Sequence, residues 1–290
     1  MSREALSFPA YMPFLLFSKE GIRVKLAFTK MHGCGNNYIY FNCFDQTVPD
    51  PESLSIKLSE PHFGIGGDGI ILISPSDKAD AQMRIFNADG SEGKMCGNGI
   101  RCVGKYVYDK GYTDKTRLTV ETLSGVRALE LSVSGGKVRS VSVDMGTAVV
   151  GETRTLTVDS GAVVCTPVSV GNPHAVLFTE DISSAPLTTL GPKLERHEAF
   201  PGGVNVEFVQ VLSENELRMR VWERGSGITM ACGTGACASV AAAVSKGFCH
   251  SDEPVLVRLD GGVLRIQIDA SGRVTMTGPA ETIYEGETVE

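Results

Sequence analysis

Two cysteines occupy matching positions in two similar segments of this chain. Residues 83–87, Met-Arg-Ile-Phe-Asn, lead to the Cys-Gly-Asn-Gly of residues 96–99. Residues 219–223, Met-Arg-Val-Trp-Glu, lead at the same spacing to the Cys-Gly-Thr-Gly of residues 232–235. Each copy is typical of a strand, a loop, a tight turn and a helix closed by a glycine. Such a duplication predicts two thiols on opposite sides of one substrate, which is the geometry needed to invert a carbon centre.

The Cys-Gly-x-Gly turn itself has a chemical use. A cysteine at a helix N-terminus lies near unpaired N–H groups and the positive end of the helix dipole, which favour the thiolate. The flanking glycines let the backbone approach a ligand, and the same helix ends can hold a carboxylate. One such turn would most simply be a packed cysteine in a tight loop. Two turns in matched positions, Cys96 and Cys232, favour a catalytic function.

Composition points to a small-molecule partner. The chain has 290 residues, 42% of them hydrophobic, which is enough for two lobes with real cores. Its net charge is −7 and its lysines and arginines form no cluster. Nucleic acid and anionic membranes are therefore poor candidate partners.

The chain has eight cysteines in all, and the other six carry no recognisable motif. A disulfide framework belongs to short secreted chains, so we expect reduced thiols in a cytoplasmic protein. Their spacings do not match the Cys-x-x-Cys of zinc or dithiol sites, and we expect no metal. We interpret them as packing residues: Cys34, Cys43, Cys102, Cys165, Cys237 and Cys249.

The N-terminal stretch is predicted to be a poorly ordered extension covering residues 1–23. Its apolar part is interrupted by Pro9 and Pro13 and lacks the continuous apolar run of a signal peptide. No segment approaches the length of about 20 apolar residues that a membrane span needs.

Short strands dominate the rest of the chain. Period-two patterns predict strands at 24–30, 37–43, 69–74, 82–87, 116–122, 126–133, 137–144, 161–170, 174–179, 204–212, 216–222, 254–259, 263–268 and 273–277. Helices are predicted only at 52–60, 98–110, 187–199 and 234–246. The last helix is apolar on nearly every face, which indicates burial on all sides, as inside a curled sheet. Two lobes should meet near residues 145–147, with the site in a cleft between them.

Six ordered motifs resemble those of the diaminopimelate epimerase family, over about residues 26–286. They lie at residues 30–38, 86–91, 95–102, 171–174, 205–208 and 223–235. The resemblance implies an α+β fold of two pseudo-symmetric lobes, each a curled, mostly antiparallel sheet around a central helix. Residues 24–143 with 277–290 would form the first lobe and residues 144–276 the second.

The resemblance also implies the activity. Members of this family interconvert LL- and meso-diaminopimelate for lysine and cell-wall precursor synthesis, without a cofactor, and a homodimer is expected. One of Cys96 and Cys232 would remove the Cα proton as thiolate while the other delivers a proton to the opposite face. His174 and Glu223 would flank the thiols. The residues implied to bind substrate are Asn36, Asn87, Gly97, Asn98, Asn172, Asn205, Glu223, Arg224, Gly233 and Thr234.

Four positions depart from the family pattern and leave the substrate range open. Asn37 stands where aspartate is usual, Pro61 where arginine is common, and Ile228 where glutamate is common, while some members have glutamine at Gly69. The alternative is a same-fold racemase acting on proline, hydroxyproline or histidine. A phenazine-type isomerase would lack the paired cysteines, and a thiol or metal-binding protein would need compact Cys/His clusters.

Overall fold

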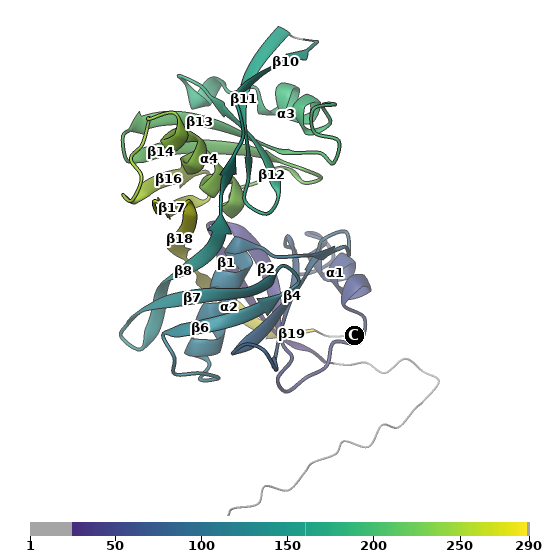
Figure 1. The fold of residues 1–290 in the computed structure, drawn as a ribbon. Coiled ribbons are helices and arrows are strands. Elements are labelled where there is room, and N and C mark those ends of the chain that lie inside the picture. Colours follow the sequence, from purple (N-terminus) through teal and green to yellow (C-terminus); the bar gives the residue numbers. More distant parts are fainter. Residues whose placement is uncertain (1–24, 160, 289–290) are drawn as a thin grey trace, which may run out of the picture.

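The computed structural model describes residues 25–159 and 161–288, so the predicted extension at 1–23 lies outside the described residues. The first half of the chain folds into one lobe of strands with two helices (Figure 1). Its elements are β1 Ala27–Gly33, β2 Asn36–Asn42, α1 Pro51–Ser59, β3 Gly69–Ser74, β4 Ala81–Asn87, β5 Glu92–Gly93, α2 Gly97–Asp109, β6 Arg117–Thr122, β7 Gly125–Ser134 and β8 Lys137–Thr147.

The second half forms another lobe of the same kind, and the chain then returns to the first. The elements are β9 Val149–Val150, β10 Arg154–Val158, β11 Gly161–Ser169, β12 Pro173–Phe178, a short 3-10 turn Ile182–Ser184, α3 Leu187–Glu195, β13 Asn205–Ser213, β14 Glu216–Glu223, β15 Gly227–Ile228, α4 Gly233–Ser245, β16 Val255–Leu259, β17 Gly262–Ile268, β18 Arg273–Pro279 and β19 Glu281–Glu287.

One continuous ladder of strands runs through both lobes. Its order is β19-β1-β2-β3-β4-β6-β7-β8-β18-β17-β16-β14-β13-β12-β11, with β5, β15, β9 and β10 attached at the sides. Parallel pairs occur at β2–β3 and β4–β6, and at the matching places β12–β13 and β14–β16. The two halves thus repeat one topology, which confirms the predicted pair of pseudo-symmetric, mostly antiparallel lobes.

Each lobe wraps its sheet around one helix. α2 packs against β1, β2, β4, β6, β7 and β8, and α4 packs against β9, β11 to β14 and β16 to β18. Every residue of α4 from Gly235 to Ala243 is buried. This confirms the predicted burial of the apolar helix on all sides. A helix surrounded in this way has no face at which a charged side chain could reach water.

Two strand pairings join the halves of the chain. β8 pairs with β18 over most of their length, from Arg273 opposite Thr147 to Pro279 opposite Ser140, and both lie at the junction of the lobes (Figure 1). β19 pairs with β1, so the C-terminal segment lies in the first lobe. Because β8 and β18 belong to both sheets, the lobe boundaries after residues 143 and 276 stay a prediction.

The structure differs from the pattern-based elements at several places. β1 runs to Gly33 because it continues into a tight hairpin, in which Cys34 and Gly35 take positive φ angles of 54° and 81°. α3 ends at Glu195, before the predicted residue 199, and contains Pro192. β10 and β19 have no counterpart among the predicted strands, because both are mostly exposed and carry little apolar pattern. The two-residue strands β5, β9 and β15 have no predicted counterpart either.

Within the part of the chain that the structure describes, no helix has the length and apolar character that crossing a membrane requires.

Candidate active site

The two matched cysteines begin the two central helices. Cys96 is the N-cap of α2, and its Sγ accepts a hydrogen bond of 3.3 Å from the N–H of Gly99. Cys232 is the N-cap of α4, and its Sγ accepts a bond of 3.3 Å from the N–H of Gly235. Each side chain therefore satisfies an N–H group that the helix leaves unpaired. The repeat in sequence is a repeat in local geometry.

These two helix starts lie against each other at the junction of the lobes. The side-chain Nδ2 of Asn98 in α2 donates 3.1 Å to the carbonyl of Ala231, the residue before Cys232. Met276 of β18 fills the space between them, since an added Cβ at Gly97 would lie 2.8 Å from its Cε and one at Gly233 would lie 3.0 Å from its Sδ. A larger residue at either glycine would require the end of the Met276 side chain to move.

The resting thiols are less acidic than the sequence predicts. Burial raises the pKa of Cys96, and the N–H groups of Gly99 and Asn98 only partly oppose it. Burial, followed by the charges of Glu223 and Glu207, raises the pKa of Cys232 well above its ordinary value. The predicted helix-end thiolate is therefore wrong as a description of the resting site, because desolvation outweighs the helix dipole.

Glu223 lies at the end of β14, beside Cys232. Thr229 donates a short hydrogen bond to its Oε1, and the thiol of Cys232 lies near the carboxyl. Burial raises the pKa of Glu223 above the usual carboxyl range, while Thr229 and Cys232 lower it. A carboxylate with a raised pKa in contact with a thiol can act as its proton acceptor.

His174 lies on β12, in the same lobe. Its Nδ1 is 2.7 Å from Oε1 of Glu207, and its Nε2 is 3.0 Å from Oδ1 of Asn172. Asn172 donates from Nδ2 to Oγ1 of Thr234 at 3.3 Å, and that hydroxyl is 3.6 Å from Sγ of Cys232. The structure thus places the four predicted residues of this group in one connected cluster.

On the other side, Asn36 connects the β1–β2 hairpin to the first thiol. Its Oδ1 accepts from Sγ of Cys96 at 3.4 Å and from Nδ2 of Asn98 at 3.3 Å. Its Nδ2 donates 2.9 Å to Asp68, which also accepts from the N–H of Asn37. The side chains of Asn36 and Asn98 therefore lie at the first thiol.

Two other predicted residues, Asn205 and Arg224, lie near the end of β14, and a third, Asn87, lies away from it. Asn205 accepts from the N–H of Arg224 at 2.9 Å, and the guanidinium of Arg224 donates 2.7 Å to the carbonyl of Gly202. Arg224 is exposed. Asn87 bonds locally to Ser91 at 3.0 Å and has no hydrogen bond to the cysteine cluster among the described residues.

Gly69 is a glycine for a local reason. Its φ is +149°, and an added Cβ would lie 2.0 Å from the carbonyl oxygen of Phe86 on the neighbouring strand. A glutamine cannot occupy this backbone conformation in this chain. Two of the residues that depart from the family pattern lie at the surface: Ile228 is 43% exposed on β15, and Pro61 is exposed. Neither belongs to the cysteine cluster.

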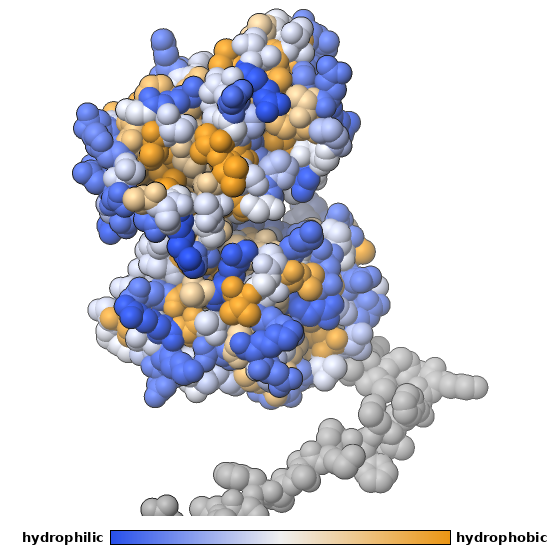
Figure 2. Space-filling view, in the orientation of Figure 1, coloured by the Kyte–Doolittle hydropathy of each residue, from blue (hydrophilic) through white to orange (hydrophobic). Residues whose placement is uncertain are grey.

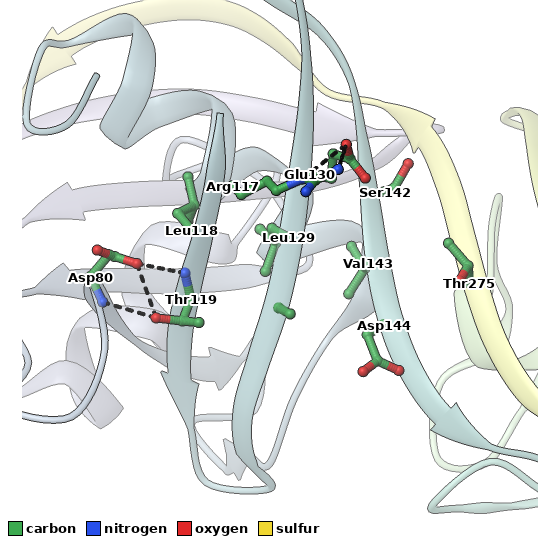
Figure 3. A pocket seen from close by; sticks show the side chains of 11 residues that line it. Asp80, Arg117, Leu118, Thr119, Leu129, Glu130, Ser142, Val143, Asp144 and Thr275 are labelled. Atoms are coloured by element: carbon green, nitrogen blue, oxygen red, sulfur yellow. Dashed lines mark hydrogen bonds and ion pairs between the residues drawn. The ribbon is translucent and has the colours of Figure 1, made fainter. Parts of the chain in front are cut away.

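A separate cavity of about 340 Å³ lies away from the thiols. Figure 3 shows it over β6, β7 and β8, where Arg117 bonds to Glu130 and Asp80 accepts from Thr119. None of the predicted site residues lines it. Figure 2 shows instead that the surface is drawn in between the lobes, which is where the two helix starts meet.

Sequence reasoning missed Glu207, Thr229 and Asp68. Asp68 contacts the site through Asn36, which is 32 residues away, so no local pattern identifies it. Thr229 bonds to Glu223, only six residues away, but belongs to no motif used in the sequence analysis. The sequence did contain a clue to Glu207, because it is a carboxylate inside the apolar strand β13. In the structure this residue is 0% exposed. A buried charge in a strand requires a partner, which is a reason to look for one.

The protein belongs to a fold class that several solved structures share. A probable proline racemase from Agrobacterium radiobacter K84 superposes with a TM-score of 0.72 at 18% identity, over 91% of this chain and 93% of that one. A phenazine biosynthesis protein from Bacillus anthracis gives a TM-score of 0.74 at 14% identity, over 92% and 100%. At these identities the likeness establishes the fold alone.

Sequence similarity identifies the family within that class. A family model described as diaminopimelate epimerase matches residues 28–151 and 166–283. A protein of Acetivibrio thermocellus named diaminopimelate epimerase is 49% identical over 276 residues, which cover 90% of this chain and 98% of that protein. This chain belongs to the diaminopimelate epimerase family, and the resemblance found in its motifs is confirmed.

Proposed function

We propose that this protein interconverts LL- and meso-diaminopimelate, with Cys96 and Cys232 as its two acid–base groups. The observation that carries this proposal is the pairing of two cysteine-capped helix starts, held together by the bond from Asn98 to Ala231. The family match supplies the substrate.

In the proposed reaction the Cα–H bond breaks and its proton goes to one thiolate. The electron pair left on carbon is delocalised into the adjacent carboxylate, and the other thiol delivers its proton to the opposite face. The product carries the inverted centre, and the two sulfurs have exchanged protonation states. Neither sulfur can serve both faces, so both are required.

The raised thiol pKa values mean that one thiol must lose its proton when substrate binds. Glu223 contacts Cys232 and is the proposed acceptor, since burial has raised the pKa of this carboxyl. The α-ammonium of the substrate adds a positive charge that favours the thiolate. A buried thiolate is thereby formed only together with the positive charge that compensates it.

The helix starts are also the proposed binding site for the reacting carboxylate. N–H groups in the first turns of α2 and α4, at Gly97, Asn98, Gly233 and Thr234, are placed to stabilise charge that develops on it. Arg224, with Asn205 behind its backbone N–H, is proposed to bind the distal carboxylate. We further propose a cytoplasmic homodimer, as the family resemblance implies.

A hydrogen-isotope experiment tests the two-base reaction. In heavy water, product formed early from LL-diaminopimelate should carry deuterium at Cα, while remaining substrate carries little. This follows because the abstracted proton stays on one sulfur and the delivered one comes from the other. Equal early labelling of substrate and product would indicate a single base that swings between faces and would overturn the proposal.

The same assay distinguishes the alternative racemase. Purified, reduced protein should act on LL-diaminopimelate and leave L-proline, trans-4-hydroxy-L-proline and L-histidine unchanged. A higher kcat/KM on any of these three would replace the proposed substrate. The isotope result would still decide the chemistry.

A further inference from the structure

A buried carboxylate lies behind the predicted site and has no assigned role. Glu207 of β13 and His174 of β12 both have side chains that are 0% exposed, and they meet at 2.7 Å. Oε2 of Glu207 has no hydrogen-bond partner among the described residues. An ionised carboxylate in this position is compensated mainly by His174, because an unpaired buried charge costs several kcal/mol.

The surrounding backbone leaves room for this carboxylate. A Cβ added at Gly235, in the first turn of α4, would lie 2.7 Å from Oε1 of Glu207. Glycine at this position therefore lets Glu207 approach the same helix turn that Cys232 caps. Since β12 and β13 are parallel neighbours, with His174 opposite Asn205, both partners are fixed by sheet pairing.

From Glu207 an unbroken series of polar contacts leads to the sulfur of Cys232. We name this series the Glu207 chain. Its links measure 2.7 Å to His174, 3.0 Å on to Asn172, 3.3 Å to Thr234 and 3.6 Å to Sγ.

Hydrogen-bonding rules allow this chain two directions. A carboxylate only accepts, so Nδ1 of His174 carries a proton in both. If Nε2 is also protonated, it donates to Oδ1 of Asn172, whose Nδ2 donates to Thr234, whose hydroxyl is then free to donate to the sulfur. If Nε2 is bare, Asn172 must turn its amide over, and every donor points away from the sulfur. The first direction stabilises a thiolate and the second a thiol.

We propose that Glu207 is a positioning residue that holds the chain in the first direction, so that its last donor stabilises the thiolate of Cys232. This inference rests on the proposed function of Cys232. The carboxylate accepts from Nδ1 of His174, and Nε2 of the same ring faces Oδ1 of Asn172, which sets the orientation of the Asn172 amide. The amide orientation in the structure, with Nδ2 toward Thr234, is the one required.

Two effects of Glu207 oppose each other, and their sum can be measured. Its negative charge acting alone raises the pKa of Cys232, as the charge of Glu223 does. Acting through the chain, it lowers that pKa. Glu207→Gln removes both the charge and the link to His174. Loss of the charge alone would lower the pKa of Cys232 and speed its alkylation, whereas loss of the chain would slow it, so the sign of the change shows which effect dominates.

The experiment is the pH dependence of Cys232 alkylation by iodoacetamide. It is followed by peptide mass spectrometry in the full chain carrying Cys96→Ala, with Glu223 unchanged. At pH 8 we expect Glu207→Gln to lower the alkylation rate roughly tenfold, equivalent to about one pKa unit. An unchanged or faster rate would overturn the proposal, because Glu207 would then act as an isolated charge or as packing. No turnover is needed, so failure here is separate from failure of the proposed function.

Two further variants complete the test. Thr234→Val breaks the last link without touching Glu207 and should slow alkylation in the same direction, whereas Thr234→Ser should restore it. This pair keeps the proposal testable if Glu207→Gln does not fold. Glu216→Gln is the control, since this carboxylate lies on the neighbouring strand β14 and pairs with Arg258 instead. Equal rates in Thr234→Val and Thr234→Ser would also overturn the proposal.

Discussion

The side chain of Asn98 donates a 3.1 Å hydrogen bond to the carbonyl of Ala231 and so joins the start of one central helix to the approach to the other. Both residues are buried, at 3% and 2% exposure. This bond lies where the two lobes meet and beside both thiols. It makes the relative position of the two sulfurs depend on one amide.

Removing this amide should therefore loosen the site. In Asn98→Ala the carbonyl of Ala231 loses its partner in a buried place, which costs about 1–3 kcal/mol. We expect a lower free energy of unfolding in urea and a kcat that falls more than tenfold, because the two acid–base groups are no longer held in register. A variant with wild-type kcat would show that the bond does not position the thiols.

Loss of either matched cysteine should abolish epimerisation. Cys96→Ala and Cys232→Ala each remove one face of a two-base reaction, and no other group can replace it. Cys102→Ala and Cys237→Ala are matched controls, since both cysteines are fully buried further along the same helices and should cost only modest stability. Activity is measured as interconversion of LL- and meso-diaminopimelate, with circular dichroism to check folding. Near wild-type turnover in either of the first two variants would contradict the assignment.

Arg224→Lys should not behave as a conservative change. A guanidinium binds a carboxylate through two parallel hydrogen bonds, which a lysine ammonium cannot reproduce. We expect kcat/KM for diaminopimelate to fall by an amount equivalent to roughly 2–5 kcal/mol, with an unchanged Tm. Arg220→Lys is the control, because Arg220 lies on β14, four residues before Arg224, and pairs with Asp260. An unchanged kcat/KM in Arg224→Lys would contradict the proposed contact between Arg224 and the distal carboxylate.

A side chain at Gly69 should destabilise the first lobe. Gly69→Ala places a Cβ against the carbonyl of Phe86 in a backbone conformation with positive φ, and we expect a loss of roughly 3 kcal/mol in urea unfolding. Gly136→Ala separates the two causes, since Gly136 has a φ of +71° but open space around it. It should lose only about 1–2 kcal/mol. Similar losses in both variants would exclude the clash as the main cause.

Buried thiols should make the fold sensitive to alkali. Burial raises the pKa of Cys102 to about 11 and that of Cys237 to about 12, from an ordinary value of 9.0. Because the pKa values of these thiols are higher in the folded state, their contribution to the free energy of unfolding is complete below pH 9. It is lost as the pH rises above 9, where the thiols ionise in the unfolded chain but not in the folded one. The loss is about 1 kcal/mol per thiol by pH 10.

The double variant Cys102→Ala, Cys237→Ala isolates this effect. Its free energy of unfolding should decrease less between pH 8 and pH 10 than that of the wild type, by about 2 kcal/mol in total. Comparing the two proteins cancels other groups that titrate in this range. Parallel pH dependences would mean that these thiols ionise in the folded protein.

Local patterns determined most of the fold. The apolar periodicity located the four α-helices of the described residues. The all-round apolar surface of residues 234–246 required burial inside a sheet, because a helix without a polar face cannot lie at a surface. The repeated Cys-Gly-x-Gly turn located both helix N-caps, since the side chain of an N-cap and the glycines around it act within one turn. The family motifs gave the residues of the candidate site.

The tertiary structure decided what depends on residues far apart in sequence. It joined Asn98 to Ala231 and Glu207 to His174, and no local pattern encodes either contact. It also reversed the expected acidity of the thiols: a helix end favours a thiolate, but burial of Cys96 and Cys232 raises their pKa values. Helix dipoles follow from local sequence, whereas desolvation depends on every element that packs around the sulfur.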